Sequence, residues 1–105
     1  LAGARLGRLR RRGIPEEVDD FVARNPVAIV AKKWCPFCQR VKAKFETLGI
    51  KYEALDLENM MHRPMVEDPE GIMSYLHEKT GRSTVPRVFV GGQFVGGCDE
   101  VMGKA

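Results

Sequence analysis

The sequence predicts an α/β domain in which a four-stranded mixed sheet is flanked by helices. Three observations predict this class. Short apolar, β-branched runs alternate with amphipathic helical patterns, a strand–helix–strand unit lies early in the chain, and a glycine turn joins two strands late in it. The early unit makes its two strands parallel, whereas a tight turn makes its two strands antiparallel. A sheet that contains both units is therefore mixed.

The first predicted helix and strand lie within residues 15–31. Pro15 is followed by acidic residues, as is typical of the first turn of a helix. The helix is expected to end near Asn25, because the next residue is Pro26. Val27–Ala31 is a short apolar run, which predicts a strand buried on both faces.

A second helix follows Cys35 and leads into the second strand. Gly49 is expected to end this helix, and Tyr52 together with Ala54–Leu57 predicts a strand parallel to the first. The helix is expected to pack through an apolar stripe formed by Val41, Phe45 and Leu48.

The remaining elements are a loop, a third helix and a hairpin. Asn59–Val66 favours a loop, and Glu67–Thr80 predicts a helix with Asp68 as its cap and Gly81 just past its end. The buried face of that helix is expected to be Ile72, Tyr75 and Leu76. The hairpin is expected to pair Arg87–Val90 with Gln93–Val95 through a Gly91-Gly92 turn, and Cys98–Ala105 leaves room only for a truncated closing helix.

The length of 105 residues predicts one domain, and the charge is unevenly distributed. The net charge is +3, but five arginines lie within residues 1–13, which leaves 12 basic against 14 acidic residues elsewhere. This balance argues against a nucleic-acid-binding domain. The longest apolar run has five residues, whereas a membrane span needs about 20. Three cysteines are too few, and odd in number, for a secreted disulfide scaffold.

We divide the chain into a basic tail, residues 1–13, and a domain, residues 14–105. An arginine-rich, acid-poor N-terminus is typical of organellar transit peptides; a solvated tail is the alternative, and binding to anionic lipid or nucleic acid is a third. We expect an intracellular, monomeric protein in the cytoplasm or in an organelle, either mitochondrion or plastid.

The segment Trp34–Cys38 is where we expect the chemistry. Cys35 is predicted to stand at the N-terminal end of a helix, where free backbone N–H groups and the helix dipole stabilise a thiolate. Cys38 follows one helical turn later on the same face and is expected to be more buried, so it can attack a mixed disulfide formed at Cys35. Lys32 adds a nearby cation, and Pro36 stiffens the first turn.

Three alternatives compete with redox chemistry at Cys35 and Cys38. Half of a zinc site is one, but no second ligand pair with suitable spacing occurs in the sequence. A pair of buried structural cysteines is another, although the expected position is an exposed loop. Iron–sulfur ligation is the third, and Pro36 disfavours it because it removes a backbone donor.

Two later segments point to the same site. In Thr84-Val85-Pro86, the proline either marks the start of an edge strand or forms a cis peptide bond that leaves the neighbouring backbone open to an extended ligand. Gly96-Gly97-Cys98-Asp99 either ends a strand, with Asp99 as a helix cap, or forms a backbone nest for a carboxylate, with Asp99 accepting from an amino group.

With these three motifs, the sequence resembles a dithiol glutaredoxin from Val27 to Asp99. The resemblance implies a thioredoxin fold and glutathione-dependent reduction of disulfides. It implies that Pro86 is cis, that the Val85 backbone pairs with the cysteine of glutathione, and that Thr84 flanks this contact. Phe37 takes the aromatic position inside the active-site motif.

The resemblance also assigns the two ends of glutathione. Lys32 would meet the glycine carboxylate, and the turn at Gly97 with the Cys98 backbone and Asp99 would hold the γ-glutamyl end. Met73 stands where family members often carry Gln or Arg, so Arg82 or Arg63 is a candidate substitute, and a related thiol is a candidate co-substrate.

The leading hypothesis is an oxidoreductase with glutathione as co-substrate and no metal. Cys35 would attack glutathione mixed disulfides or protein disulfides, and Cys38 would resolve protein mixed disulfides. The expected partners are glutathione and disulfide-containing or glutathionylated proteins. One alternative is an iron–sulfur carrier that uses Cys35 and glutathione as ligands; another is a redox-sensing adaptor without turnover.

Overall fold

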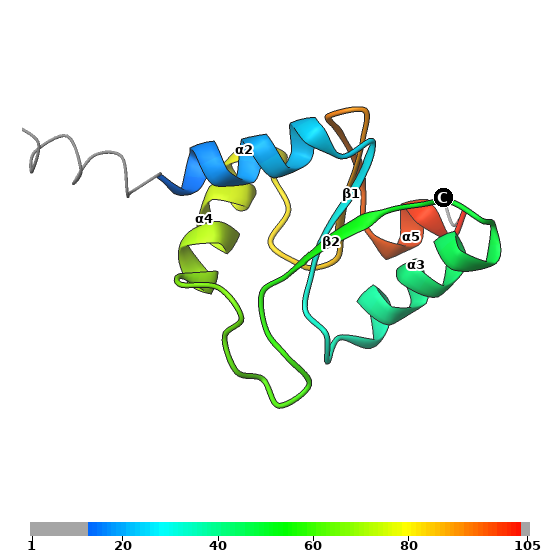
Figure 1. Ribbon diagram of the computed structural model, residues 1–105, viewed down its shortest axis with the longest axis horizontal. Helices are drawn as coiled ribbons and strands as arrows, with labels where there is room; N and C mark the ends of the chain where they lie inside the picture. Colours follow the sequence, from blue (N-terminus) through cyan, green and yellow to red (C-terminus); the bar gives the residue numbers. More distant parts are fainter. Residues whose placement is uncertain (1–12, 104–105) are drawn as a thin grey trace, which may run out of the picture.

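The computed structural model describes residues 13–103 and shows one mixed sheet between two pairs of helices (Figure 1). The strand order is β2-β1-β3-β4. The parallel pairing of β1 with β2 and the antiparallel hairpin of β3 and β4 confirm the predictions, and β1 also pairs antiparallel with β3. The basic tail up to residue 12 lies outside the described residues. The elements are α2 (Ile14–Arg24), β1 (Val27–Ala31), α3 (Pro36–Thr47), β2 (Glu53–Asp56), α4 (Pro69–Thr80), β3 (Arg87–Val90), β4 (Gln93–Gly96) and α5 (Cys98–Val101).

Strand β1 divides the interior into two cores, because successive side chains of a strand point to opposite faces. Ala28 and Val30 pack against α2 and α4, whereas Ile29 and Ala31 face the cysteines and α3. Figure 1 shows α2 and α4 on one side of the strands, and α3 and α5 on the other. We call these sides the α2/α4 face and the α3/α5 face.

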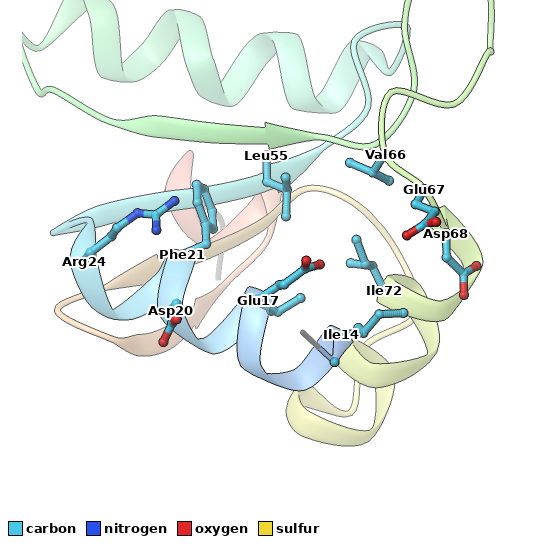
Figure 2. Close-up of a pocket in the computed structure, with 12 residues that line it drawn as sticks. Ile14, Glu17, Asp20, Phe21, Arg24, Leu55, Val66, Glu67, Asp68 and Ile72 are labelled. Atoms are coloured by element: carbon cyan, nitrogen blue, oxygen red, sulfur yellow. The ribbon is translucent and has the colours of Figure 1, made fainter. Parts of the chain in front are cut away.

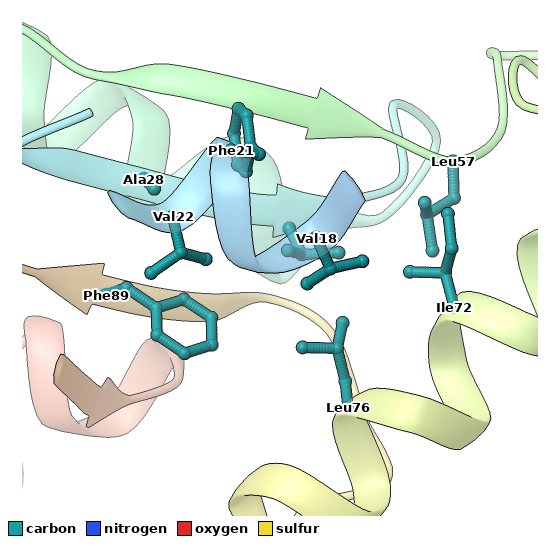
Figure 3. Close-up of a cluster of buried hydrophobic side chains, with 9 residues drawn as sticks. Val18, Phe21, Val22, Ala28, Leu57, Ile72, Leu76 and Phe89 are labelled. Atoms are coloured by element: carbon teal, nitrogen blue, oxygen red, sulfur yellow. The ribbon is translucent and has the colours of Figure 1, made fainter. Parts of the chain in front are cut away.

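The α2/α4 face holds the larger apolar cluster (Figure 3). Helix α2 begins at Gly13, has Pro15 in its first turn, and ends where the Asn25 side chain donates to the carbonyl of Phe21 at 2.8 Å. Its apolar side points to the strands and meets α4. The buried members of the cluster are Val18, Phe21, Val22, Ala28, Val30, Leu57, Ile72, Leu76 and Phe89.

Helix α4 has the predicted cap and the predicted end, but it begins at Pro69, two residues later than expected. The Asp68 side chain accepts from the backbone N–H of Gly71 at 3.0 Å, which satisfies a donor that the helix itself cannot pair. Gly81 ends the helix in the left-handed conformation, with φ of 75°. Residues 59–66 form the predicted loop, and Tyr75 is half-buried rather than fully buried.

The hairpin turn uses two positive backbone angles, with φ of 59° at Gly91 and 83° at Gly92. Glycine adopts such angles without steric cost, which is why a Gly-Gly pair predicts a tight hairpin. The prediction for Leu48 was wrong. Helix α3 ends at Thr47, and Leu48 is 58% exposed and does not join the buried stripe of Val41 and Phe45.

The short last helix α5 also differs from one sequence expectation. Asp99 does not cap it; the helix begins after Gly97, and the side chain of Glu100 accepts from the Gly97 backbone N–H at 2.7 Å. None of the described helices combines the length and the apolar character that a membrane crossing requires.

Candidate active site

The two cysteines lie where β1 passes into α3. Cys35 is the residue that precedes the first turn of α3, and its backbone N–H donates to the Lys32 carbonyl at 3.1 Å, which closes a tight turn. Its Sγ accepts from the backbone N–H of Cys38 at 3.3 Å. The sulfur of Cys35 therefore takes the position of a helix-capping oxygen, with a backbone N–H of the first helical turn directed at it.

Both thiols are buried, which corrects the expectation of an exposed loop for Cys35. Cys35 is 5% exposed and Cys38 is fully buried, because both side chains pack into the core of the α3/α5 face. The pKa of the Cys38 thiol is raised to about 12, chiefly by burial and also by its interaction with Cys35, against the opposing effect of the Lys32 backbone. Cys38 is therefore a protonated thiol at neutral pH, one turn behind Cys35.

The Thr84-Val85-Pro86 segment lies beside Cys35. The Val85–Pro86 peptide bond is cis, as predicted, and the Val85 carbonyl oxygen lies 4.0 Å from the Cys35 Sγ. A hollow of about 300 Å³ opens next to this contact. It is lined by Phe37, Arg82, Thr84, Val85, Pro86, Gly97, Cys98, Asp99 and Glu100.

All the predicted binding residues except Lys32 line this hollow, although they come from three separate segments of the chain. Phe37 is 54% exposed at its rim, and Cys98 is a half-buried free thiol. The predicted nest at Gly97 is partly filled, because Glu100 already accepts from its N–H.

Lys32 is held by a carboxylate that sequence reasoning missed. Its ammonium lies 3.5 Å from Glu58 Oε2, while Trp34 Nε1 donates to Glu58 Oε1 at 2.7 Å. The Trp34 donor and the Lys32 charge together lower the pKa of Glu58. His62 stacks on Trp34 with the ring centroids 4.2 Å apart. These contacts tie the loop after β2 to the cysteine turn.

The two candidate substitutes for the residue at position 73 differ in position. Arg82 lines the hollow, whereas Arg63 lies in the exposed loop after β2 and does not line it. The Met73 sulfur accepts a hydrogen bond from Arg87, a residue of β3 that is fully buried. The Arg87 Nη2 donates to the Arg82 carbonyl, and the Arg87 Nε has no partner among residues 13–103. Burial lowers the pKa of Arg87.

A larger hollow, of about 790 Å³, lies between α2 and the start of α4, beside β2 (Figure 2). Its floor includes Phe21, Leu55 and Ile72, and carboxylates such as Glu17 and Glu67 border it. No cysteine lines it, whereas the Cys35 Sγ lies 4.0 Å from the carbonyl oxygen of Val85, which lines the smaller hollow, so we place the redox chemistry beside the smaller hollow.

The mixed sheet, the paired cysteines at a helix start and the neighbouring cis proline define a thiol–disulfide oxidoreductase with a thioredoxin fold. The glutaredoxin family model matches residues 27–95, and the chain belongs to this family, whose members are glutathione-dependent oxidoreductases.

Relatives and solved structures agree with this assignment. The chain is 42% identical to "Glutaredoxin-C6" of Oryza sativa subsp. japonica over 79% of its own length and 69% of that protein. It is 36% identical to "Glutaredoxin-C1" of Arabidopsis thaliana over 97% of its own length and 77% of that protein. A buckwheat glutaredoxin–glutathione complex superposes with a TM-score of 0.78 and 36% identity, covering 86% of this chain and 76% of that one.

Proposed function

We propose that the protein reduces glutathione mixed disulfides and protein disulfides, with Cys35 as the nucleophile and Cys38 as the resolving thiol. The observation that carries this proposal is the position of the Cys35 Sγ. It accepts a helix N–H at 3.3 Å and lies beside a hollow of about 300 Å³ at which three motif segments meet. The hollow has room for part of a small peptide, and the polar groups around it favour one that carries charges.

With a glutathione mixed disulfide, the Cys35 thiolate attacks the glutathionyl sulfur. The old disulfide breaks, and the client leaves as a thiolate that takes up a proton. A second glutathione thiolate then attacks glutathionylated Cys35, releases glutathione disulfide and restores the Cys35 thiolate. Each cycle therefore consumes one free glutathione: the client sulfur is reduced to a thiol, and the sulfur of that glutathione is oxidised as it joins the glutathionyl group from the substrate in glutathione disulfide.

With a protein disulfide, Cys35 forms a mixed disulfide with the client. Cys38 must lose its proton to attack the Cys35 sulfur, and its burial and raised pKa keep it inactive until that stage. The attack releases the reduced client and leaves a Cys35–Cys38 disulfide, which two glutathione molecules reduce.

We propose that the hollow holds glutathione through Thr84, Val85 and Pro86 on one side and through Gly97, Cys98 and Asp99 on the other, with Phe37 at its rim. This assignment rests on the common lining of one hollow by these residues. Lys32 does not line the hollow and forms an ion pair with Glu58; we propose that it contacts the ligand from beside the hollow.

The proposal is tested by locating the first covalent adduct. The Cys38→Ser variant is incubated with glutathione disulfide, and peptide mass spectrometry identifies the cysteine that gains a glutathionyl group. We expect the adduct on Cys35. Because Cys98 is a half-buried thiol in the same hollow, it serves as the internal comparison. An adduct mainly on Cys98 would show that the nucleophile is misassigned.

A further inference from the structure

Arg82 is a cation inside the hollow to which the mechanism above gives no role. It lies in the segment between α4 and β3, and its side chain is 45% exposed. The guanidinium lies 5.8 Å from the centre of the Phe94 ring, which supports its position independently of any ion pair. A guanidinium placed in this way can bind a carboxylate.

The chain's own carboxylate occupies this cation. Arg82 Nη2 donates to Glu100 Oε2 at 2.9 Å, and the other oxygen, Oε1, accepts from the Gly97 backbone N–H at 2.7 Å. These two donors lower the pKa of Glu100 to about 2, so the carboxylate is ionised at every pH at which the protein works. Arg82 therefore faces any ligand with its charge already paired.

A ligand carboxylate can displace Glu100 from its ion pair with Arg82. The Glu100 side chain is 40% exposed, and an ion pair between exposed side chains in water contributes little net free energy. Glu100 belongs to a helix of one turn, α5, and its side chain needs only a rotamer change to swing into solvent. A ligand carboxylate can then take its place on the guanidinium, which Phe94 still supports.

We propose that Arg82 is a carboxylate-binding residue of this hollow and that Glu100 is its internal counter-ion, displaced when a carboxylate of glutathione binds. The inference rests on the proposed function and adds a residue pair that sets the affinity for glutathione. Glu100 lowers that affinity, so the site favours prompt release of glutathione disulfide over tight binding.

The test is a double-variant cycle on the full chain, with steady-state turnover of a glutathionylated model protein. In Glu100→Gln, the amide oxygen can still accept from Gly97, but the negative charge is gone. Because the hollow beside Cys35 takes up the glutathionyl group of the substrate, we expect the KM for the glutathionylated protein to fall about two- to fivefold with kcat unchanged, as suits the loss of one weak ion pair. Arg82→Gln should raise that KM, and Glu100→Gln should then have no effect in the Arg82→Gln background.

Two controls separate this effect from a general change of charge or fold. Asp19→Asn removes an exposed carboxylate from an ion pair with Lys79 on the α2/α4 face, and it should leave the KM for the glutathionylated protein unchanged. In a single turnover with bis(2-hydroxyethyl) disulfide, a substrate without a carboxylate, and without glutathione, Glu100→Gln should leave the rate of reaction with Cys35 unchanged.

The proposal is overturned if Glu100→Gln leaves the KM unchanged or raises it. It is also overturned if the KM falls equally in the Arg82→Gln background, or if the rate with bis(2-hydroxyethyl) disulfide changes to the same degree. Absence of glutathione-dependent turnover in the unmodified chain is a different result, because it would contradict the proposed function rather than the pairing of Arg82 with Glu100.

Discussion

The two faces of the sheet use the same strands for different purposes. On the α2/α4 face, every buried cluster member is an aliphatic or aromatic residue from a helix, a strand or a strand end. On the α3/α5 face, the buried cluster contains both active-site cysteines, and the helix that follows them covers it. The comparison shows that the thiols are part of a core rather than additions to a loop.

This difference has a physical consequence. Burial of apolar surface is the main source of stability, and a thiol contributes to it as a small hydrophobic group as long as it stays protonated. Cys38 fits this description, because it is fully buried and its pKa is raised to about 12. We therefore expect substitutions on the α2/α4 face to change stability, and substitutions at the cysteines to change chemistry.

Cys35→Ser should have the largest effect on the α3/α5 face. The first new bond of either reaction forms at the Cys35 sulfur, and a serine hydroxyl at neutral pH cannot replace a thiolate. We expect no turnover above the uncatalysed exchange by glutathione, on every disulfide substrate, with little change in Tm. Retained turnover would break the assignment of the nucleophile.

Cys38→Ser should affect turnover of glutathione mixed disulfides and of protein disulfides differently. Glutathione can release glutathionylated Cys35 without Cys38, so turnover of glutathione mixed disulfides should survive. A protein mixed disulfide hinders glutathione, whereas Cys38 attacks from the next helical turn at high effective concentration, so reduction of structured protein disulfides should fall about tenfold or more. Equal loss on both substrates in a coupled assay would make Cys38 structural.

Leu76→Ala tests whether a change on the α2/α4 face lowers stability without changing catalysis on the other face. Leu76 is fully buried in α4 within the α2/α4 cluster, and truncation of a buried leucine costs about 2–5 kcal/mol. We expect denaturant unfolding to show that loss, while kcat/KM per folded molecule at low temperature stays within about twofold of the original. A matched loss of activity in still-folded protein would mean that the two faces are coupled.

Much of this architecture could be predicted because local rules and tertiary packing agree. Short-range sterics, capping and hydrophobic patterning account for the helix starts at Pro15 and Asp68, the Gly91-Gly92 turn and the apolar strand Val27–Ala31. Most residues of the hollow could be predicted because they belong to short motifs, although their meeting at one site followed only from the family resemblance. Glu100 also lines the hollow, and no motif of the sequence analysis contained it.

The missed features depend on contacts between distant segments, which a linear pattern does not contain. Cys35 is buried by neighbours from other elements, and Glu58 pairs with Lys32 and Trp34 across the sheet end. Leu48 fits the helical period but follows the end of the helix, so it points into solvent. Arg87 begins an apolar strand, and nothing in the sequence indicates that its side chain is fully buried.

The pH at which the Cys38 thiol ionises shows how completely the α3/α5 face excludes water from this side chain. Since desolvation is the main cause of the raised pKa of about 12, that pKa should stay above 10 when Cys35 is absent. In a Cys35→Ala/Cys98→Ser variant, we expect almost no thiolate absorbance at pH 9 and a rise of about tenfold per pH unit towards pH 10. The variant without any cysteine supplies the tyrosine background. A midpoint near pH 9 would mean that Cys38 is solvated.

Removal of residues 1–12 should have the smallest effect of all. The tail joins the α2/α4 face at Gly13, whose carbonyl accepts from the Glu17 N–H at 3.1 Å, so a chain that begins at Gly13 keeps the first hydrogen bond of α2. The predicted domain starts at residue 14, and the sequence before it contains no cysteine. We expect kcat/KM on glutathione mixed disulfides to stay within about twofold, because even the loss of an exposed ion pair costs only about 0–1 kcal/mol.

The control deletes Gly13 as well, which removes the helix-starting carbonyl and should lower Tm without changing kcat/KM. If removal of residues 1–12 alone abolishes turnover of folded protein, the tail contributes to the α3/α5 face, and the boundary between tail and domain is wrong.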